Sequence, residues 1–174
     1  MKWIVIVIGG LVALVALVAI GGALLPRDHR ATSTVTLRQT PDSVWQVVRD
    51  LGSIPGWWTE ITVSERLADR DGREAWRQKM SGWDVPLVIL ESDPPRRLVT
   101  KIDSGENASF GGTWTYELIP VPEGTQVSIT EDGWVSNPIF RFLSRFVFGY
   151  YGSLDGYLKA LGRRFGEEVK PQHS

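Results

Sequence analysis

The stretch TSTVTLRQTPDSVW, residues 32–45, decides how the folded part of the chain begins. Its first half alternates, with Val35 and Leu37 on one face, which is typical of a half-buried strand over 32–39. Thr40 then supplies a capping hydroxyl and Pro41 suits the first helical position, so a helix is expected to begin there. The folded part therefore starts with a strand that leads directly into a helix.

The chain from residue 52 to residue 134 predicts one more helical turn and then a run of strands. Residues 52–58, GSIPGWW, contain too many helix-breaking residues for more than one short helix. Turn signals then separate six strands, and short links between successive strands favour antiparallel pairing. The predicted strands cover residues 61–68, 74–80, 85–92, 97–102, 109–119 and 125–134, with breaks at 71–72, 81–82, 93–95, 104–107 and 122–124.

A second helix start follows the last strand. Asn137 is a capping residue, Pro138 suits the first helical position, and apolar residues then recur at helical spacing. One long helix is expected from 138 to about 168, bent near 149–152 because glycines gather there. The tail, residues 169–174, is expected to be flexible.

These elements predict an α+β fold. An antiparallel sheet of seven strands must cover its apolar face, and only the last helix is long enough to do so. The order of elements resembles the SRPBCC superfamily, which includes START, Bet v 1 and polyketide cyclase/dehydrase proteins. The resemblance is carried by TLRQTPDSVW (36–45), IPGWW (54–58), TEDG (130–133) and NPIFRF (137–142).

The resemblance implies a helix-grip domain over residues 27–168, with a cavity between the sheet and the last helix. Members of the superfamily hold lipids or other apolar ligands in this space, and in some members it contains an active site. The resemblance does not name a ligand, because proteins with one fold differ widely in function.

The first 26 residues predict a transmembrane anchor. Trp3 to Leu25 contains no charged residue and no proline, and a helix of this length spans the apolar layer of a bilayer. A cleaved signal peptide is the alternative, although its apolar region is usually shorter. The sequence thus favours a single-pass protein of the cell membrane. Basic residues are nearly balanced on the two sides of the segment, so its orientation stays open, although the short basic N-terminus resembles a signal anchor that leaves the domain outside the cytoplasm.

Composition excludes several classes of site. The 174 residues contain no cysteine, so thiolate chemistry and thiolate metal ligands are absent. Nineteen basic and twenty acidic residues give a formal charge of −1, which does not favour a nucleic acid as partner. No motif indicates a cofactor or a metal ion, and nothing in the sequence identifies a protein partner.

Strand alternation and helix spacing select the candidate ligand residues. Trp114 and Tyr116 share a face of one strand, and Ile129 and Glu131 share a face of the next. The full set of candidates is Trp57, Trp58, Trp76, Met80, Trp114, Tyr116, Ile129, Glu131, Phe142, Phe146 and Tyr150. Trp57 and Trp58 are also candidates for a gate or a membrane contact, and the aromatic start of the last helix for contact with lipid or a partner.

Glu131 is the one ionisable carboxylate among the candidate ligand residues. An acidic residue on the same face as buried residues can bind a ligand through a polar contact or act on it as a general acid or base. Alternatively, it lies at the solvent-exposed end of the strand and pairs with Arg141 or Arg145. His29 and His173 flank the domain, so we expect neither in a folded site, which removes a histidine-based triad.

The sequence favours a membrane-tethered carrier or sensor of an apolar small molecule or lipid over an enzyme. Two alternatives stay open. One is a polyketide cyclase/dehydratase-like enzyme that uses Glu131, and the other is a protein-interaction module at the membrane.

Overall fold

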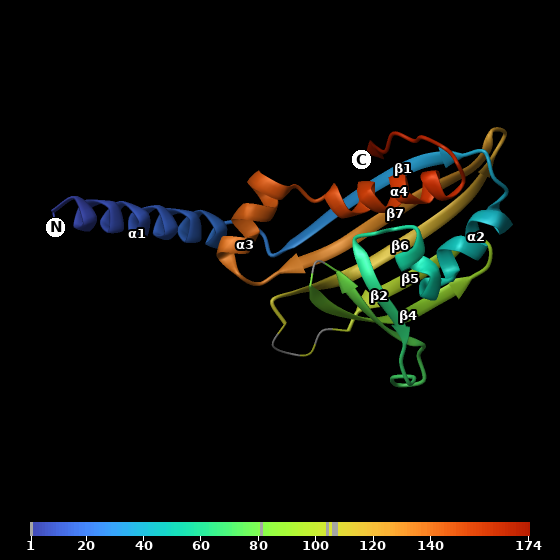
Figure 1. The fold of residues 1–174 in the computed structure, drawn as a ribbon, viewed down its shortest axis with the longest axis horizontal. Helices are drawn as coiled ribbons and strands as arrows, with labels where there is room; N and C mark the ends of the chain where they lie inside the picture. The colour runs from blue at the N-terminus through green and yellow to red at the C-terminus, as the bar shows by residue number, and fades with distance from the viewer. Residues whose placement is uncertain (1, 81, 104, 106–107) are drawn as a thin grey trace.

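The computed structural model describes residues 2–80, 82–103, 105 and 108–174 and shows one sheet curved around a C-terminal helix (Figure 1). Neighbouring strands are antiparallel, in the order β2-β3-β4-β5-β6-β7-β1-β8. The strands are β1 (Asp28–Leu37), β2 (Ile61–Arg66), β3 (Ala75–Met80), β4 (Trp83–Asp93), β5 (Arg97–Ile102), β6 (Phe110–Val121), β7 (Gly124–Val135) and β8 (Gln172–His173). The α+β helix-grip fold is therefore confirmed, and the predicted breaks at 81–82 and 104–107 include residues outside the described part.

The first helix is positioned by its cap. The Thr40 side chain accepts a hydrogen bond from the amide of Ser43, and α2 (Pro41–Arg49) begins at the expected proline. Val44 and Val48 bury the inner face of α2. A 3₁₀ turn, η1 (Leu51–Gly56), follows it as the second short helix.

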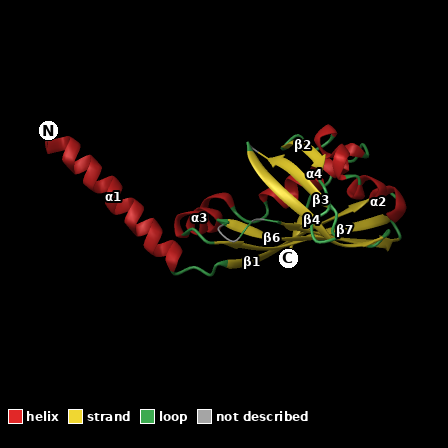
Figure 2. Ribbon diagram, turned by 90° about the horizontal axis from the view of Figure 1, so that it is seen from below, coloured by secondary structure: helices red, strands yellow, loops and turns green. Residues whose placement is uncertain are grey.

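Helix α4 (Gly152–Arg164) lies over the concave face of the sheet (Figure 2). Its inner side chains Leu154, Tyr157, Leu158 and Leu161 are buried to 1% exposure or less. They join inward residues of β1, β6 and β7 in one apolar cluster. Burial of apolar side chains from both the helix and the sheet therefore holds α4 in place.

The continuous helix expected from 138 to 168 is wrong. The segment is α3 (Pro138–Leu143), a π-helical turn η2 (Ser144–Phe148), and then α4. Gly149 separates them with φ of 74°, a conformation that ends a helix and that glycine adopts readily. The expected bend at 149–152 is thus a complete break.

The tail is also not loose as expected. Gln172 and His173 form β8 on the edge of β1, which gives the sheet an eighth strand. His173 Nε2 lies 3.0 Å from both carboxylate oxygens of Asp155, and its ring stacks on Tyr151 at 3.9 Å. Two side-chain contacts therefore hold a strand that is too short to show periodicity in the sequence.

Helix α1 (Lys2–Ala23) projects from the domain, and α3 lies at its base (Figure 1). It is the one helix in the described part of the chain that is long and apolar enough to cross a membrane. At the joint, a Cβ on Gly22 would lie 1.8 Å from the carbonyl oxygen of Pro138. Arg141 of α3 also donates a 2.9 Å hydrogen bond to the carbonyl of Leu25, so α1 and α3 pack closely.

Candidate functional site

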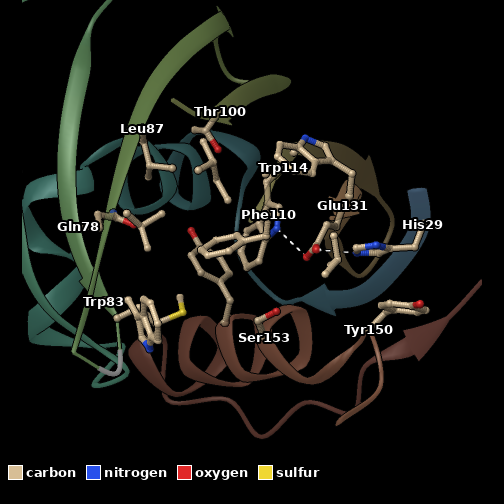
Figure 3. A pocket seen from close by; sticks show the side chains of 18 of the residues that line it. His29, Gln78, Trp83, Leu87, Thr100, Phe110, Trp114, Glu131, Tyr150 and Ser153 are labelled. Atoms are coloured by element: carbon tan, nitrogen blue, oxygen red, sulfur yellow. Dashed lines mark hydrogen bonds and ion pairs between the residues drawn. The ribbon is translucent and has the colours of Figure 1, made fainter. Parts of the chain in front are cut away.

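A cavity of about 540 Å³ lies between the curved sheet and α4 (Figure 3). Its wall contains residues of α2 and η1, of β1 and β3 to β7, and of α3, η2 and α4. The lining residues are His29, Val48, Leu51, Ile54, Trp58, Gln78, Met80, Trp83, Val85, Leu87, Leu98, Thr100, Ile102, Ser109, Phe110, Gly111, Gly112, Trp114, Tyr116, Glu131, Trp134, Val135, Phe140, Ser144, Gly149, Tyr150, Ser153 and Tyr157.

Glu131 is the centre of a polar group in this wall. One carboxylate oxygen lies 3.0 Å from Nε2 of His29, and the other accepts a 2.9 Å hydrogen bond from the indole of Trp114 (Figure 3). The side chains are 11% exposed for His29 and 21% exposed for Glu131. A carboxylate that is removed from water needs such donors, so the pair is fixed by mutual hydrogen bonding.

The position of His29 depends on strand register. His29 lies opposite Gly133 in the β1–β7 ladder, and its ring crosses over that glycine to reach Glu131. A Cβ on Gly133 would lie 2.5 Å from Cε1 of His29. On the other side, the imidazole stacks on Tyr150, with ring centres 4.1 Å apart (Figure 3).

Aromatic rings form the next part of the wall. Tyr157 of α4 makes edge or tilted contacts with Trp58, Trp114 and Tyr116 at centre distances of 5.2 to 6.1 Å. Burial raises the pKa of both Tyr116 and Tyr157 above the usual tyrosine value. The Tyr157 hydroxyl and the Trp58 indole nitrogen are buried without a hydrogen-bond partner in the described part of the chain.

Several predicted residues reach the wall. They are Trp58, Met80, Trp114, Tyr116, Glu131 and Tyr150. The predicted alternation of the last two long strands is confirmed by cross-strand pairs, since Trp114 lies opposite Glu131 and Tyr116 opposite Ile129.

Other predicted residues lie elsewhere. Trp57 packs edge-on against Tyr157, Trp76 donates to Glu74 at 2.7 Å, and Ile129 is fully buried in the core. Phe142 and Phe146 contact each other on the α3–η2 segment, and neither lines the cavity. Phe142 lies against α1, where a Cβ on Gly21 would be 3.3 Å from its ring, whereas Phe140 of the same segment does line the cavity.

The expectation that neither histidine belongs to a folded site is wrong. His29 is bound to Glu131, and His173 to Asp155. The alternative in which Glu131 pairs with Arg141 fails too, because Arg141 donates to main-chain oxygens of Leu25 and Ser136. The signal for His29 was present, since it is in phase with Ala31, Val35 and Leu37, but the strand was predicted to begin four residues later at Thr32 instead of Asp28.

The wall is mostly apolar, and the His29–Glu131 pair is its charged group among the described residues. Among the described residues, no group of three or more His, Cys, Asp or Glu is arranged to hold a metal ion. The His29–Glu131 pair has the form of an imidazole oriented by a carboxylate, which is suited to hydrogen bonding or to proton transfer.

The model of the family "Polyketide cyclase / dehydrase and lipid transport" matches residues 28–164. No curated protein matches the chain. A START superfamily protein from Mycobacterium smegmatis is 20% identical, with a TM-score of 0.60 over 78% of this chain and 97% of its own.

Two further solved structures share the fold. A conserved protein from Geobacillus kaustophilus is 14% identical, with a TM-score of 0.64 over 83% of this chain and 100% of its own. The di-domain ARO/CYC StfQ from the steffimycin biosynthetic pathway is 12% identical, with a TM-score of 0.60 over 78% of this chain and 49% of its own. At these identities the likeness concerns the fold alone.

Proposed function

The chain belongs to the polyketide cyclase/dehydrase and lipid transport family, and on that premise we propose that it is a membrane-tethered carrier or sensor. Its ligand is a hydrophobic small molecule or a lipid, held between the sheet and α4. This function combines the cavity with the apolar N-terminal helix.

The observation that carries the proposal is the cavity. A volume of about 540 Å³ falls within the range of roughly 300–1,000 Å³ found for small-molecule sites. Its wall is dominated by aliphatic and aromatic side chains, with few polar groups, which is the composition that favours an apolar ligand. A site of this size without a ligand would expose apolar surface to water at a cost in free energy.

The membrane part of the proposal is supported by α1 and its joint with α3. Helix α1 has 22 residues, which at about 1.5 Å per residue approach the thickness of the hydrocarbon layer. The domain follows it with a short link, and Arg141 bonds the end of α1 at Leu25. A membrane span at α1 holds the domain close to the lipid surface.

The α3–η2 segment supports contact with lipid as well. Phe146, Val147 and Phe148 are each more than 60% exposed, which is unusual for large apolar side chains in water. Phe140 of α3 is half exposed and also lines the cavity. The segment thus joins the cavity wall to the surface next to α1, and it is a route by which a ligand passes between cavity and bilayer.

The test uses the full chain in nanodiscs of one synthetic phospholipid. Organic extraction and mass spectrometry then ask whether a stoichiometric apolar molecule other than that phospholipid travels with the protein. Empty nanodiscs are the control. A protein that carries no such molecule and also takes up no apolar fluorescent probe would contradict the proposal.

The His29–Glu131 pair favours a second candidate, a cyclase- or dehydratase-like enzyme. An imidazole oriented by a carboxylate moves protons efficiently, and here it faces an apolar cavity. In this case Glu131→Gln abolishes turnover of the extracted ligand while the fold is retained. Turnover at the wild-type rate in Glu131→Gln excludes this candidate.

A further inference from the structure

The cavity wall has an unusual charge content. Among the described residues, Glu131 is the one charged side chain in the wall, and no lysine or arginine lines it. Arg27 lies 5.9 Å from the ring centre of Trp134, which is a wall residue, but Arg27 is not itself in the wall. Arg141 is likewise outside it and is bound to main-chain oxygens.

The hydrogen bonds at Glu131 assign the donor and acceptor roles at this end of the cavity. A carboxylate only accepts, so Nε2 of His29 and the indole nitrogen of Trp114 are both donors to it. In neutral imidazole the other ring nitrogen is then an acceptor. Nδ1 of His29 has no hydrogen-bond partner in the part of the chain that the structure describes.

We infer that the His29–Glu131 end of the cavity recognises a hydrogen-bond donor on the ligand, a hydroxyl or an ammonium group, and rejects carboxylates and phosphates. This inference rests on the proposed function and specifies its ligand class. It concerns the polar head only, because aliphatic and aromatic side chains dominate the rest of the wall.

The reason is the cost of removing an anion from water. A carboxylate head that enters the cavity loses its hydration, finds no lysine or arginine among the described wall residues, and approaches the negative charge of Glu131. A hydroxyl donates to a free lone pair of Glu131, or to Nδ1 of a neutral His29. An ammonium group does the same and also gains from the carboxylate and the aromatic rings.

Three probes with the same apolar ring test this selectivity. They are 2-naphthalenemethanol, 2-naphthalenemethylamine and 2-naphthoate, titrated by calorimetry into the full chain in zwitterionic nanodiscs, with empty nanodiscs subtracted. We expect the alcohol, the amine, or both to bind at least about tenfold more tightly than the carboxylate. The order of the alcohol and the amine shows whether the natural head is neutral or cationic.

Glu131→Gln gives an independent readout in the same assay. Removal of the negative charge reduces the discrimination against 2-naphthoate, whereas Glu123→Gln, in an exposed turn, leaves all three affinities unchanged. The wild-type comparison stands even where Glu131→Gln does not fold.

The outcomes separate the two proposals. Binding of 2-naphthoate as tightly as the other two probes overturns the inference and leaves the proposed function in place. Binding of none of the three overturns the inference, and together with an empty extract it overturns the proposed function as well.

Discussion

His29 and Glu131 are 102 positions apart in the chain, yet His29 Nε2 lies 3.0 Å from a carboxylate oxygen of Glu131, across a glycine. Gly133 provides the space, because a Cβ there would lie 2.6 Å from Nε2 of His29 and 2.9 Å from the same carboxylate oxygen. The contact between His29 and Glu131 therefore depends on the absence of a side chain at Gly133.

Gly133→Ala is expected to separate His29 from Glu131 and to lower the free energy of unfolding by about 1–3 kcal/mol, since overpacking forces both side chains to move. Urea denaturation followed by tryptophan fluorescence measures the change. Gly152→Ala is the matched control, because nothing lies within 4 Å of its Cβ and the helix gains from alanine. Equal stability of Gly133→Ala and wild type would contradict the geometry of the pair.

Tyr116 and Tyr157 predict a loss of stability in alkali. Burial raises the pKa of both phenols in the folded state, whereas in the unfolded chain they titrate near the ordinary value of about 10. Above that pH the unfolded chain releases protons that the folded chain keeps, so each tyrosine removes about 1.4 kcal/mol of stability per pH unit. Below about pH 10 the stabilisation is fully present.

Denaturation at pH 9, 10 and 11 measures this slope. Tyr116→Phe and Tyr157→Phe should each make it less steep, while Tyr151→Phe, outside the cavity wall, should not. Because the Tyr157 hydroxyl has no hydrogen-bond partner among the described residues, Tyr157→Phe should also be as stable as wild type, or more stable, at pH 7. A slope that none of the three variants changes would exclude the two buried phenols as its source.

Gly22→Ala tests the joint between α1 and α3. Its Cβ would meet the main-chain oxygen of Pro138 at 1.8 Å, and a main-chain atom cannot move aside without displacing α3. Amide hydrogen exchange of residues 138–148 should become about tenfold faster, while exchange of the sheet stays the same. Gly10→Ala, in open space on the same helix, is the control. Unchanged exchange in Gly22→Ala would mean that α1 and α3 do not pack together.

The long strands of the fold follow closely from the sequence, because alternation has a period of two residues and repeats several times along each of them. Trp114 and Glu131 were each predicted on the cavity face of their own strand, and in the structure they lie opposite each other. Helix α2 begins at the predicted proline. These features depend on neighbours within the same element. Local pattern was enough to identify the apolar wall on β6 and β7.

Features that depend on distant partners were missed. His29 stood outside the predicted strand, because two inward positions of β1, His29 and Ser33, are polar and do not show as an apolar face in the sequence. The break at Gly149 follows from the separate packing of α3 on α1 and α4 on the sheet, which helical periodicity cannot distinguish from one long helix. The same holds for β8, whose two residues are held by partners on β1 and α4.

Asp155 of α4 contacts both β1 and β8 through its carboxylate. Its carboxylate accepts a 2.8 Å hydrogen bond from the hydroxyl of Ser33, which is fully buried on β1, and it also binds His173. Asp155→Ala leaves the Ser33 hydroxyl buried without its acceptor, so unfolding free energy should fall by about 1–3 kcal/mol. His173→Ala removes only the partner that is 41% exposed, and should cost less than about 1 kcal/mol.

The double variant separates the two contributions. If Asp155 holds β1, α4 and β8 through one carboxylate, Asp155→Ala combined with His173→Ala should be no less stable than Asp155→Ala alone, since the histidine has already lost its partner. Lys170→Ala, in the segment before β8, is the control and should match wild type. Fully additive losses in the double variant would show that His173 stabilises the fold through its stacking on Tyr151 and not through Asp155.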